Sequence, residues 1–342
     1  MTRRDGHKLP LTGPDLVHHS GCPVCGSAAV RPFSRTEHNG TQLTHQLCAA
    51  CGLLFMDPVP TQDWYDRLYR EEFWEVKART PGEQADAGQR NPAYWWKALG
   101  RAEKFADLLS QHAEKGAIQS VLEIGAAYGV IGRYLADQLG VRTYAVEPNE
   151  TARTFAAGVC GATLVGRSVS DVSQWRPDRP LDLVMFSHVL ENIVDQDATM
   201  RAVKRVLRPG GYLLIETPNA AEKASMSIYH PYCFTRSSLE HLLGRHGFRV
   251  RSAATSGRPA SVLSRRYLTV LATNEPPTAA PRREPGMLAL RRRAAHALSF
   301  AKRGGPIGYV DRLVVRSKYR PSEHSRALMQ YLSAQSALRK AG

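Results

Sequence analysis

The chain has 342 residues, more than one ordinary domain needs, and 43% of them are hydrophobic and 23% charged, which is typical of a soluble globular protein. It has no apolar run of about 18 residues and no apolar stretch after its basic first residues, so we expect neither a membrane span nor a signal peptide, and we expect a cytoplasmic location. The formal net charge is +15, which excludes an acidic protein and raises the question of anionic partners.

Two cysteine pairs follow a segment, residues 1–19, that we expect to be flexible. CPVCG and CAACG supply Cys22, Cys25, Cys48 and Cys51, with about 22 residues between the pairs. In a cytosolic chain such pairs are more often metal ligands than disulfides, and four thiolates at this spacing can enclose a structural zinc ion. We therefore predict a zinc ribbon over residues 20–60. The alternatives are a redox-active C-x-x-C pair and a metal-free core.

After the cysteine unit, the chain has a helical pattern first and then strands that alternate with helices. Residues 61–113 predict a helical connection, in which Thr61 is a plausible N-cap. From 114 to 274, short apolar strands alternate with helices, and this alternation predicts a mostly parallel sheet covered on both faces. The expected strands are SVLEIG, RTYAVEP, ATLVG, LDLVMFSH, RPGGYLLIETPN, FRVRSAAT and RRYLTVLATN.

A Pro-rich linker, residues 275–285, precedes a basic region, 286–342, that we expect to be helical, most clearly in LALRRRAAHALSFAKR. From Arg249 to the end there are nineteen Lys and Arg and four Asp and Glu. This excess can bind nucleic acid, an anionic membrane or an acidic substrate, or it can form a solvated basic face.

The loop in VLEIGAAYGV is a candidate ligand loop, because it follows a strand and opens a helix. Glu147 comes about 22 residues after Gly125 and ends the next strand, where one carboxylate can accept both hydroxyls of a ribose. A dinucleotide also requires a third glycine for its pyrophosphate, and Val130 occupies that position. Glu123 would repel a pyrophosphate but suit an ammonium or sulfonium group. The predicted ligand is therefore S-adenosylmethionine.

Five segments together resemble a class I S-adenosylmethionine-dependent methyltransferase over about residues 95–273. They are VLEIGAAYGVIGRYL, YAVEPN, LDLVMFSHVLENI, VLRPGGYLLIETPN and HPYCFTRSSLEHLLGRHGF. The resemblance implies a Rossmann-like α/β sheet of seven strands, the last antiparallel. It also implies a cofactor site in which Glu147 holds the ribose. The methionine end would lie along Glu123, Gly125, Ala126 and Gly129. The adenine would lie beside Pro148, Ser168 and Val169, and Ser187 would lie beside the methyl group. Where that family often has LEH, this chain has LEN, so no role is carried over from the missing histidine.

Two histidines are candidate general bases. His188 ends a central strand, and His230 lies in a loop that faces the acceptor in the family that the chain resembles. His241 lies within an expected helix and has the pattern of a structural residue. We therefore expect O-methylation of a small molecule such as a sugar, a nucleotide-linked sugar or a secondary metabolite.

Other acceptors stay open. The cysteine unit resembles the zinc ribbons of some natural-product and sugar methyltransferases and of certain ribosomal RNA methyltransferases. An RNA methyltransferase that uses the ribbon and the basic tail is thus an alternative, although SHVL stands where a [DN]-P-P-[YFW] motif would favour nucleobase methylation. C- or N-methylation of a small molecule is a further alternative. The ribbon-bearing sugar C-methyltransferases carry a long second α/β domain, for which the remaining residues are too few.

Overall fold

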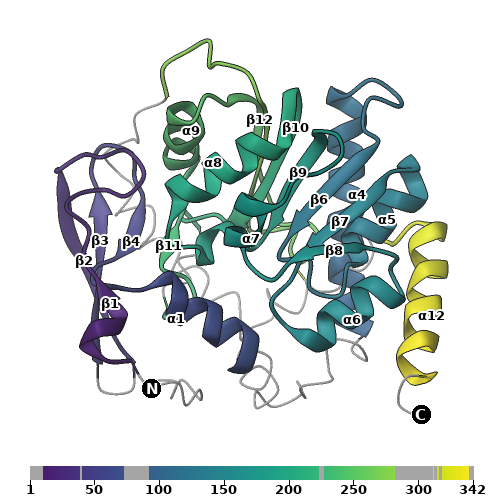
Figure 1. Ribbon diagram of the computed structural model, residues 1–342, viewed down its shortest axis with the longest axis horizontal. Coiled ribbons are helices and arrows are strands. Elements are labelled where there is room, and N and C mark those ends of the chain that lie inside the picture. The colour runs from purple at the N-terminus through teal and green to yellow at the C-terminus, as the bar shows by residue number, and fades with distance from the viewer. Residues whose placement is uncertain are drawn as a thin grey trace.

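The computed structural model describes residues 11–38, 41–72, 92–222, 227–281, 311, 314–315 and 318–338. A large central sheet carries helices on both faces, a small cysteine-rich unit lies at one end of it, and a C-terminal helix lies at the other end (Figure 1). Among the described residues, no helix is both long and apolar enough to cross a membrane.

The central sheet has seven strands in the order β12-β13-β10-β9-β6-β7-β8. Their bounds are β6 Ser120–Ile124, β7 Arg142–Val146, β8 Thr163–Gly166, β9 Leu181–Ser187, β10 Leu207–Pro218, β12 Arg249–Ser256 and β13 Tyr267–Thr273. Neighbouring strands pair parallel in the part of the sheet ordered β10-β9-β6-β7-β8. Strand β13 runs antiparallel to both of its neighbours, β10 and β12. The predicted α/β sheet of seven strands with an antiparallel last strand is thereby confirmed.

Helices cover each face of this sheet, because alternate residues of its strands point to opposite sides. One apolar core lies between the sheet and α4, α5, α6 and α12, and the other lies between the sheet and α7, α8 and α9. The helix bounds are α4 Pro92–His112, α5 Val130–Leu139, α6 Glu150–Gly158, α7 Val169–Gln174, α8 Gln196–Val206, α9 Arg236–Arg245 and α12 Glu323–Leu338. In β10, Leu213 and Ile215 face the second core, whereas Leu214 faces the first.

The cysteine-rich unit contains a second sheet, of the order β11-β4-β3-β2. Three of its strands come from the N-terminal part, and the fourth, β11, comes from the segment after β10. The bounds are β2 Val30–His38, β3 Thr41–Cys48, β4 Leu54–Met56 and β11 Tyr232–Cys233. A separate pair joins β1 Leu16–Val17 to β5 Val59–Pro60, so part of the segment expected to be flexible forms a strand pair.

Side-chain caps start several helices, and one of them, Thr61, is the N-cap that the sequence indicates. The Thr61 hydroxyl accepts a hydrogen bond from the Trp64 N–H, 3.3 Å away, and opens α1 (Gln62–Arg67), which continues as a π-helical turn, η2 (Leu68–Glu72). Asn149 and Thr235 cap α6 and α9 in the same way. The short helices η1 (Gly13–Asp15) and η3 (Leu190–Asn192) complete the described elements.

The C-terminal helix α12 is anchored to α4 by a buried carboxylate. Glu103 accepts hydrogen bonds from the Ser322 N–H (2.7 Å) and from the Ser325 hydroxyl (2.6 Å), and Leu328 and Leu332 of α12 are buried in the first core. A helix at 323–338 agrees with the expected helical C-terminal region. The segment LALRRRAAHALSFAKR and residues 73–91 lie outside the described residues.

Candidate active site

The candidate site lies at the carboxyl ends of the parallel strands, between β6 and β9, where the order in which the chain adds strands to the sheet changes direction. From β6 the chain moves outward through β7 to β8, and it then crosses to β9 on the other side of β6. Loops at such a switch point diverge and leave room for a ligand. The predicted loop residues follow β6, Glu147 follows β7, and Ser187 ends β9.

The loop after β6 depends on two glycines. Gly125 has φ +73°, and a Cβ built on it would lie 2.3 Å from Val189 Cγ2. Gly129 also has φ +73°, caps α5, and approaches Ala156 so closely that a Cβ would lie 2.9 Å from the Ala156 Cβ. The N–H groups of Gly125 and Ala126 donate to the Val146 carbonyl (2.8 and 3.1 Å), so the loop is fastened to the end of β7.

Glu147 links this loop to the next one. Its Oε2 accepts a hydrogen bond from the Ala127 N–H (2.8 Å) and its Oε1 accepts one from the Asn149 N–H (3.0 Å). The residue is 5% exposed. These two bonds orient the carboxylate, and an ionised carboxylate has about four acceptor positions.

Glu123 lies buried at the end of β6, and its Oε2 accepts a hydrogen bond from the Gly132 N–H, 3.2 Å away. Burial, together with the neighbouring charge of Glu147, raises the pKa of Glu123 to about 8, although the bond from Gly132 acts in the opposite direction. A cationic group bound beside it would favour the ionised form.

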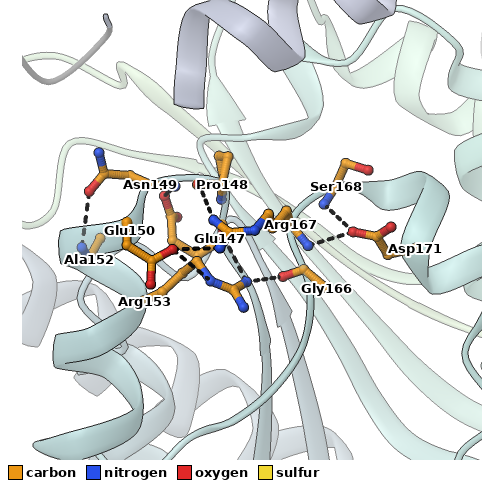
Figure 2. A network of polar contacts seen from close by, with 10 residues as sticks. All are labelled: Glu147, Pro148, Asn149, Glu150, Ala152, Arg153, Gly166, Arg167, Ser168 and Asp171. Carbon is orange, nitrogen blue, oxygen red and sulfur yellow. Dashed lines mark hydrogen bonds and ion pairs between the residues drawn. The ribbon is translucent and has the colours of Figure 1, made fainter. Parts of the chain in front are cut away.

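The predicted adenine side is held together by two arginines, as Figure 2 shows. Arg153 donates to the carbonyls of Glu147 (3.1 Å) and Gly166 (2.5 Å), and it thereby ties the loop after β7 to the end of β8. Arg167 donates to the Pro148 carbonyl (3.3 Å) and to the Glu150 carboxylate. Ser168 caps α7, and its N–H donates to Asp171 (3.0 Å); Val169 is the first residue of that helix.

His188 follows β9 in a left-handed conformation, with φ +60°. Its N–H donates to the Glu216 carbonyl (2.8 Å). The imidazole lies between two buried carboxylates: Nδ1 is 3.4 Å from Glu191 Oε1, and Nε2 is 3.6 Å from Glu216 Oε1. The ring also packs edge-on against Tyr267, at a centroid distance of 5.1 Å. Both carboxylates are therefore within ion-pair distance of the imidazole.

Glu216 is fully buried in β10 and accepts hydrogen bonds from side chains of two other elements, α4 and β13. Its Oε1 accepts a hydrogen bond from Arg101 Nε (3.1 Å), and its Oε2 accepts bonds from Lys104 Nζ and the Thr269 hydroxyl (2.8 Å). The sequence prediction did not include Glu216, Glu191, Arg101 or Lys104. The one available signal was a glutamate inside the apolar strand segment LLIETP.

The second histidine, His230, lies in the segment between β10 and β11. Its segment joins the N-terminal part: the hydroxyls of Tyr65 and Tyr69 donate to the carbonyls of Ile228 (2.6 Å) and Tyr229 (3.1 Å), and Met56 N–H donates to Pro231 (2.8 Å). His241 Nδ1 lies 2.9 Å from the Ser237 carbonyl within α9, consistent with a structural residue.

The four cysteines converge as predicted. Their sulfur atoms all lie within 4.8 Å of one another, and the pairs Cys22–Cys51 and Cys25–Cys48 are both 3.6 Å apart. Four sulfurs around a tetrahedral zinc ion at about 2.3 Å would be about 3.8 Å apart, so the cluster has the dimensions of a closed zinc site.

Comparison with known proteins finds a methyltransferase domain within the chain. Residues 95–253, a little under half of the chain, match a family model described as a methyltransferase domain. With the sheet order and the antiparallel β13, the match identifies this part of the chain as a class I, S-adenosylmethionine-dependent methyltransferase domain. The resemblance stated from the sequence, and the expectation of a methyltransferase, are thereby confirmed.

Curated relatives match over short segments. The ubiquinone/menaquinone biosynthesis C-methyltransferase UbiE of Pectobacterium atrosepticum is 37% identical over 83 residues, 24% of this chain and 31% of that protein. UbiE of Shewanella frigidimarina is 36% identical over 59 residues, 17% and 24% respectively. The polyketide synthase-nonribosomal peptide synthetase ffsA of Aspergillus flavipes is 32% identical over 123 residues, 33% of this chain and 3% of that protein. The chain thus spans less than a third of each of these relatives.

Solved methyltransferase structures match about half of the chain. The glycopeptide N-methyltransferase MtfA complexed with (S)-adenosyl-L-methionine is 17% identical with a TM-score of 0.41, over 52% of this chain and 93% of that one. A SAM-dependent methyltransferase from Archaeoglobus fulgidus is 18% identical with a TM-score of 0.41, over 50% and 94%. At these scores, the likeness does not bear on the acceptor.

Proposed function

We propose that this protein methylates a hydroxyl oxygen of a small molecule, with S-adenosylmethionine as donor and His188 as the general base. The observation that carries the proposal is the position of the His188 imidazole, which follows β9 and lies within 3.6 Å of two buried carboxylates. A hydroxyl is a weak nucleophile until its proton is removed, and a positioned base contributes about 10²- to 10⁴-fold to such a step.

The donor would be held by the residues predicted for it. Glu147 accepts the ribose hydroxyls, and the adenine lies beside Pro148, Ser168 and Val169. The methionine end lies along Gly125, Ala126 and Gly129, with Glu123 facing its positive charge and Ser187 near the methyl group. The bound donor supplies a methyl group on a positively charged sulfur. The chain orients it and excludes water from it.

In the proposed step, His188 accepts the proton of the acceptor hydroxyl while that oxygen attacks the methyl carbon. The new bond is oxygen to carbon, the broken bond is carbon to sulfur, and the electron pair of the broken bond stays on sulfur. Glu191 and Glu216 then stabilise the imidazolium that forms on His188. His230 is the second candidate for the base.

We further propose a structural zinc ion on Cys22, Cys25, Cys48 and Cys51. The sulfur spacing fits the ion, and four protein ligands leave no position for a reacting water. We retain the division into a ribbon (20–60), a helical connection (61–113), a methyltransferase domain (114–274), a linker (275–285) and a basic C-terminal region (286–342).

C-methylation is the second candidate, because the relatives from Pectobacterium and Shewanella are named C-methyltransferases. A carbon nucleophile also needs a base, so the same histidine could serve it. The two reactions differ in where the label of a carbon-13 methyl donor ends, on oxygen or on carbon, and the NMR spectrum of the product distinguishes them.

The test is a mass-shift screen of hydroxylated small molecules with the labelled donor. We expect wild-type protein to add one methyl group to oxygen, and His188→Gln to reduce turnover at least about 100-fold. The control, His241→Gln, changes a histidine within α9 and should retain activity. Normal activity of His188→Gln would exclude the base role. RNA binding that falls steeply with salt, without turnover of any small molecule, would favour the RNA alternative instead.

A further inference from the structure

The buried carboxylate of Glu216 is shared between the candidate base and two cations of α4. Its side chain is 0% exposed. His188 Nε2 and Arg101 Nε both approach Oε1, at 3.6 and 3.1 Å, while Lys104 Nζ and the Thr269 hydroxyl bind Oε2. Glu216 therefore bridges His188, at the carboxyl end of β9, to the helix that covers this face of the sheet.

The charges around Glu216 limit how many protons the neighbouring bases, Lys104 and His188, can hold together. When ionised, Glu191 and Glu216 supply two negative charges, and Arg101 supplies one positive charge. One more positive charge balances the set, and both Lys104 and His188 are able to provide it. An unbalanced charge in a buried site is unfavourable, so protonation of one of these two bases disfavours protonation of the other.

We infer that Lys104 controls how readily His188 accepts a proton, because Lys104 binds the buried carboxylate of Glu216 and His188 lies within ion-pair distance of it. A charged Lys104 neutralises Glu216 and leaves His188 neutral, which is the form that accepts a proton from an acceptor. Lys104 and Glu216 are positioning residues here, since they act through His188. The inference rests on the proposed function only in calling His188 the base.

The surroundings of Lys104 favour such an exchange. Burial, with Arg101 and Arg258 nearby, lowers the pKa of Lys104 well below its usual value, and this brings the lysine closer to the range of an imidazole. The other groups that face the pair are the ring of Tyr267, 5.6 Å from Lys104 Nζ and 5.1 Å from the His188 ring centroid, and the ring of Phe105, 5.4 Å from Lys104 Nζ.

The test is an NMR titration of the full chain, loaded with zinc and labelled at histidine, in which His188→Gln assigns the His188 signal. Lys104→Met should raise the pKa of His188 by about one to three units, because Glu216 loses a neutralising charge. Lys104→Arg retains the charge and should leave the pKa near the wild-type value. Glu216→Gln removes the carboxylate and should lower it.

The outcomes separate this inference from the proposed function. If neither Lys104→Met nor Glu216→Gln moves the His188 titration, the inference is wrong. If Lys104→Met does not fold, the nearly isosteric Glu216→Gln decides alone, and an unchanged or raised pKa overturns the inference. Where the titration moves, the acidic limb of the kcat–pH profile should move with it. If the His188 pKa changes in these variants, but the acidic limb of the kcat–pH profile does not and His188→Gln is active, the coupling through Glu216 stands. His188 is then not the general base.

Discussion

The hydroxyl of Thr235 donates a hydrogen bond to the main-chain carbonyl of Cys51, 3.0 Å away, and so joins the start of α9 to the second C-x-x-C pair. Next to it, β11 pairs with β4, at Tyr232 with Phe55 and at Cys233 with Leu54. The segment that contains His230 is thus built into the sheet of the cysteine-rich unit (Figure 1). The unit and the segment should therefore lose their structure together.

Replacing Thr235 by Val should weaken this junction. The hydroxyl also accepts a hydrogen bond from the Ser238 N–H (3.1 Å) as the cap of α9, so its loss removes a cap and leaves the buried Cys51 carbonyl without this donor. We expect a loss of about 2 kcal/mol in the free energy of unfolding, measured by urea denaturation. Thr235→Ser retains the hydroxyl and should lose less than half as much. Equal losses in both variants would contradict a role for the hydroxyl.

Replacing Cys48 by Ser should release the metal and loosen the β4–β11 pair. A hydroxyl is a poorer zinc ligand than a thiolate, and zinc binding contributes directly to the folding of such units. We expect bound zinc to fall from one per chain towards zero by elemental analysis, and hydrogen exchange to speed up at residues 54–56 and 232–233. Cys160→Ser, outside the cluster, should retain the zinc. One zinc per chain in Cys48→Ser would reject the four-cysteine site.

Replacing Glu147 by Gln should weaken the binding of S-adenosylmethionine about tenfold to a hundredfold, because hydrogen bonds to a charged acceptor contribute about 1.5–3 kcal/mol. Isothermal titration calorimetry measures this directly. Glu275→Gln is the matched control, since Glu275 is partly exposed and pairs with Arg249 beyond the end of β13. Unchanged affinity in Glu147→Gln would mean that the ribose is held elsewhere.

Glu123 should make the stability of the ligand-free protein fall as the pH rises. Its folded-state pKa is raised to about 8, above the usual value of 4.5, so the folded state binds more protons than the unfolded state between these two values. The contribution is therefore present below about pH 4.5 and is lost as the pH rises towards 8. Thermal melts from pH 5 to 8 should show a smaller decline for Glu123→Gln than for wild type. Parallel declines would count against a buried, protonated Glu123.

The sequence predicted those parts of the fold that depend on local pattern. The apolar runs SVLEIG, RTYAVEP and LDLVMFSH were predicted as strands, and the structure has β6, β7 and β9 at these residues. The cysteine cluster was equally accessible, because the spacing of Cys22, Cys25, Cys48 and Cys51 is itself the signal.

The parts that depend on distant contacts were not accessible from sequence. Glu216 binds Arg101, 115 positions away, and Thr269, 53 positions away, and no local pattern pairs these residues. The pairing of β11 with β4 involves a strand of only two residues, too short to show alternation. Both features depend on tertiary packing between segments that are far apart in the sequence.

The central claim is that the loop from Glu123 to Gly129, together with Glu147, binds S-adenosylmethionine and not a dinucleotide. Calorimetric titration of the zinc-loaded chain with each ligand tests it most directly. We predict saturable heat for S-adenosylmethionine, strongly reduced in Glu147→Gln, and none for NADH. Tight binding of NADH, with no heat from S-adenosylmethionine, would contradict the account.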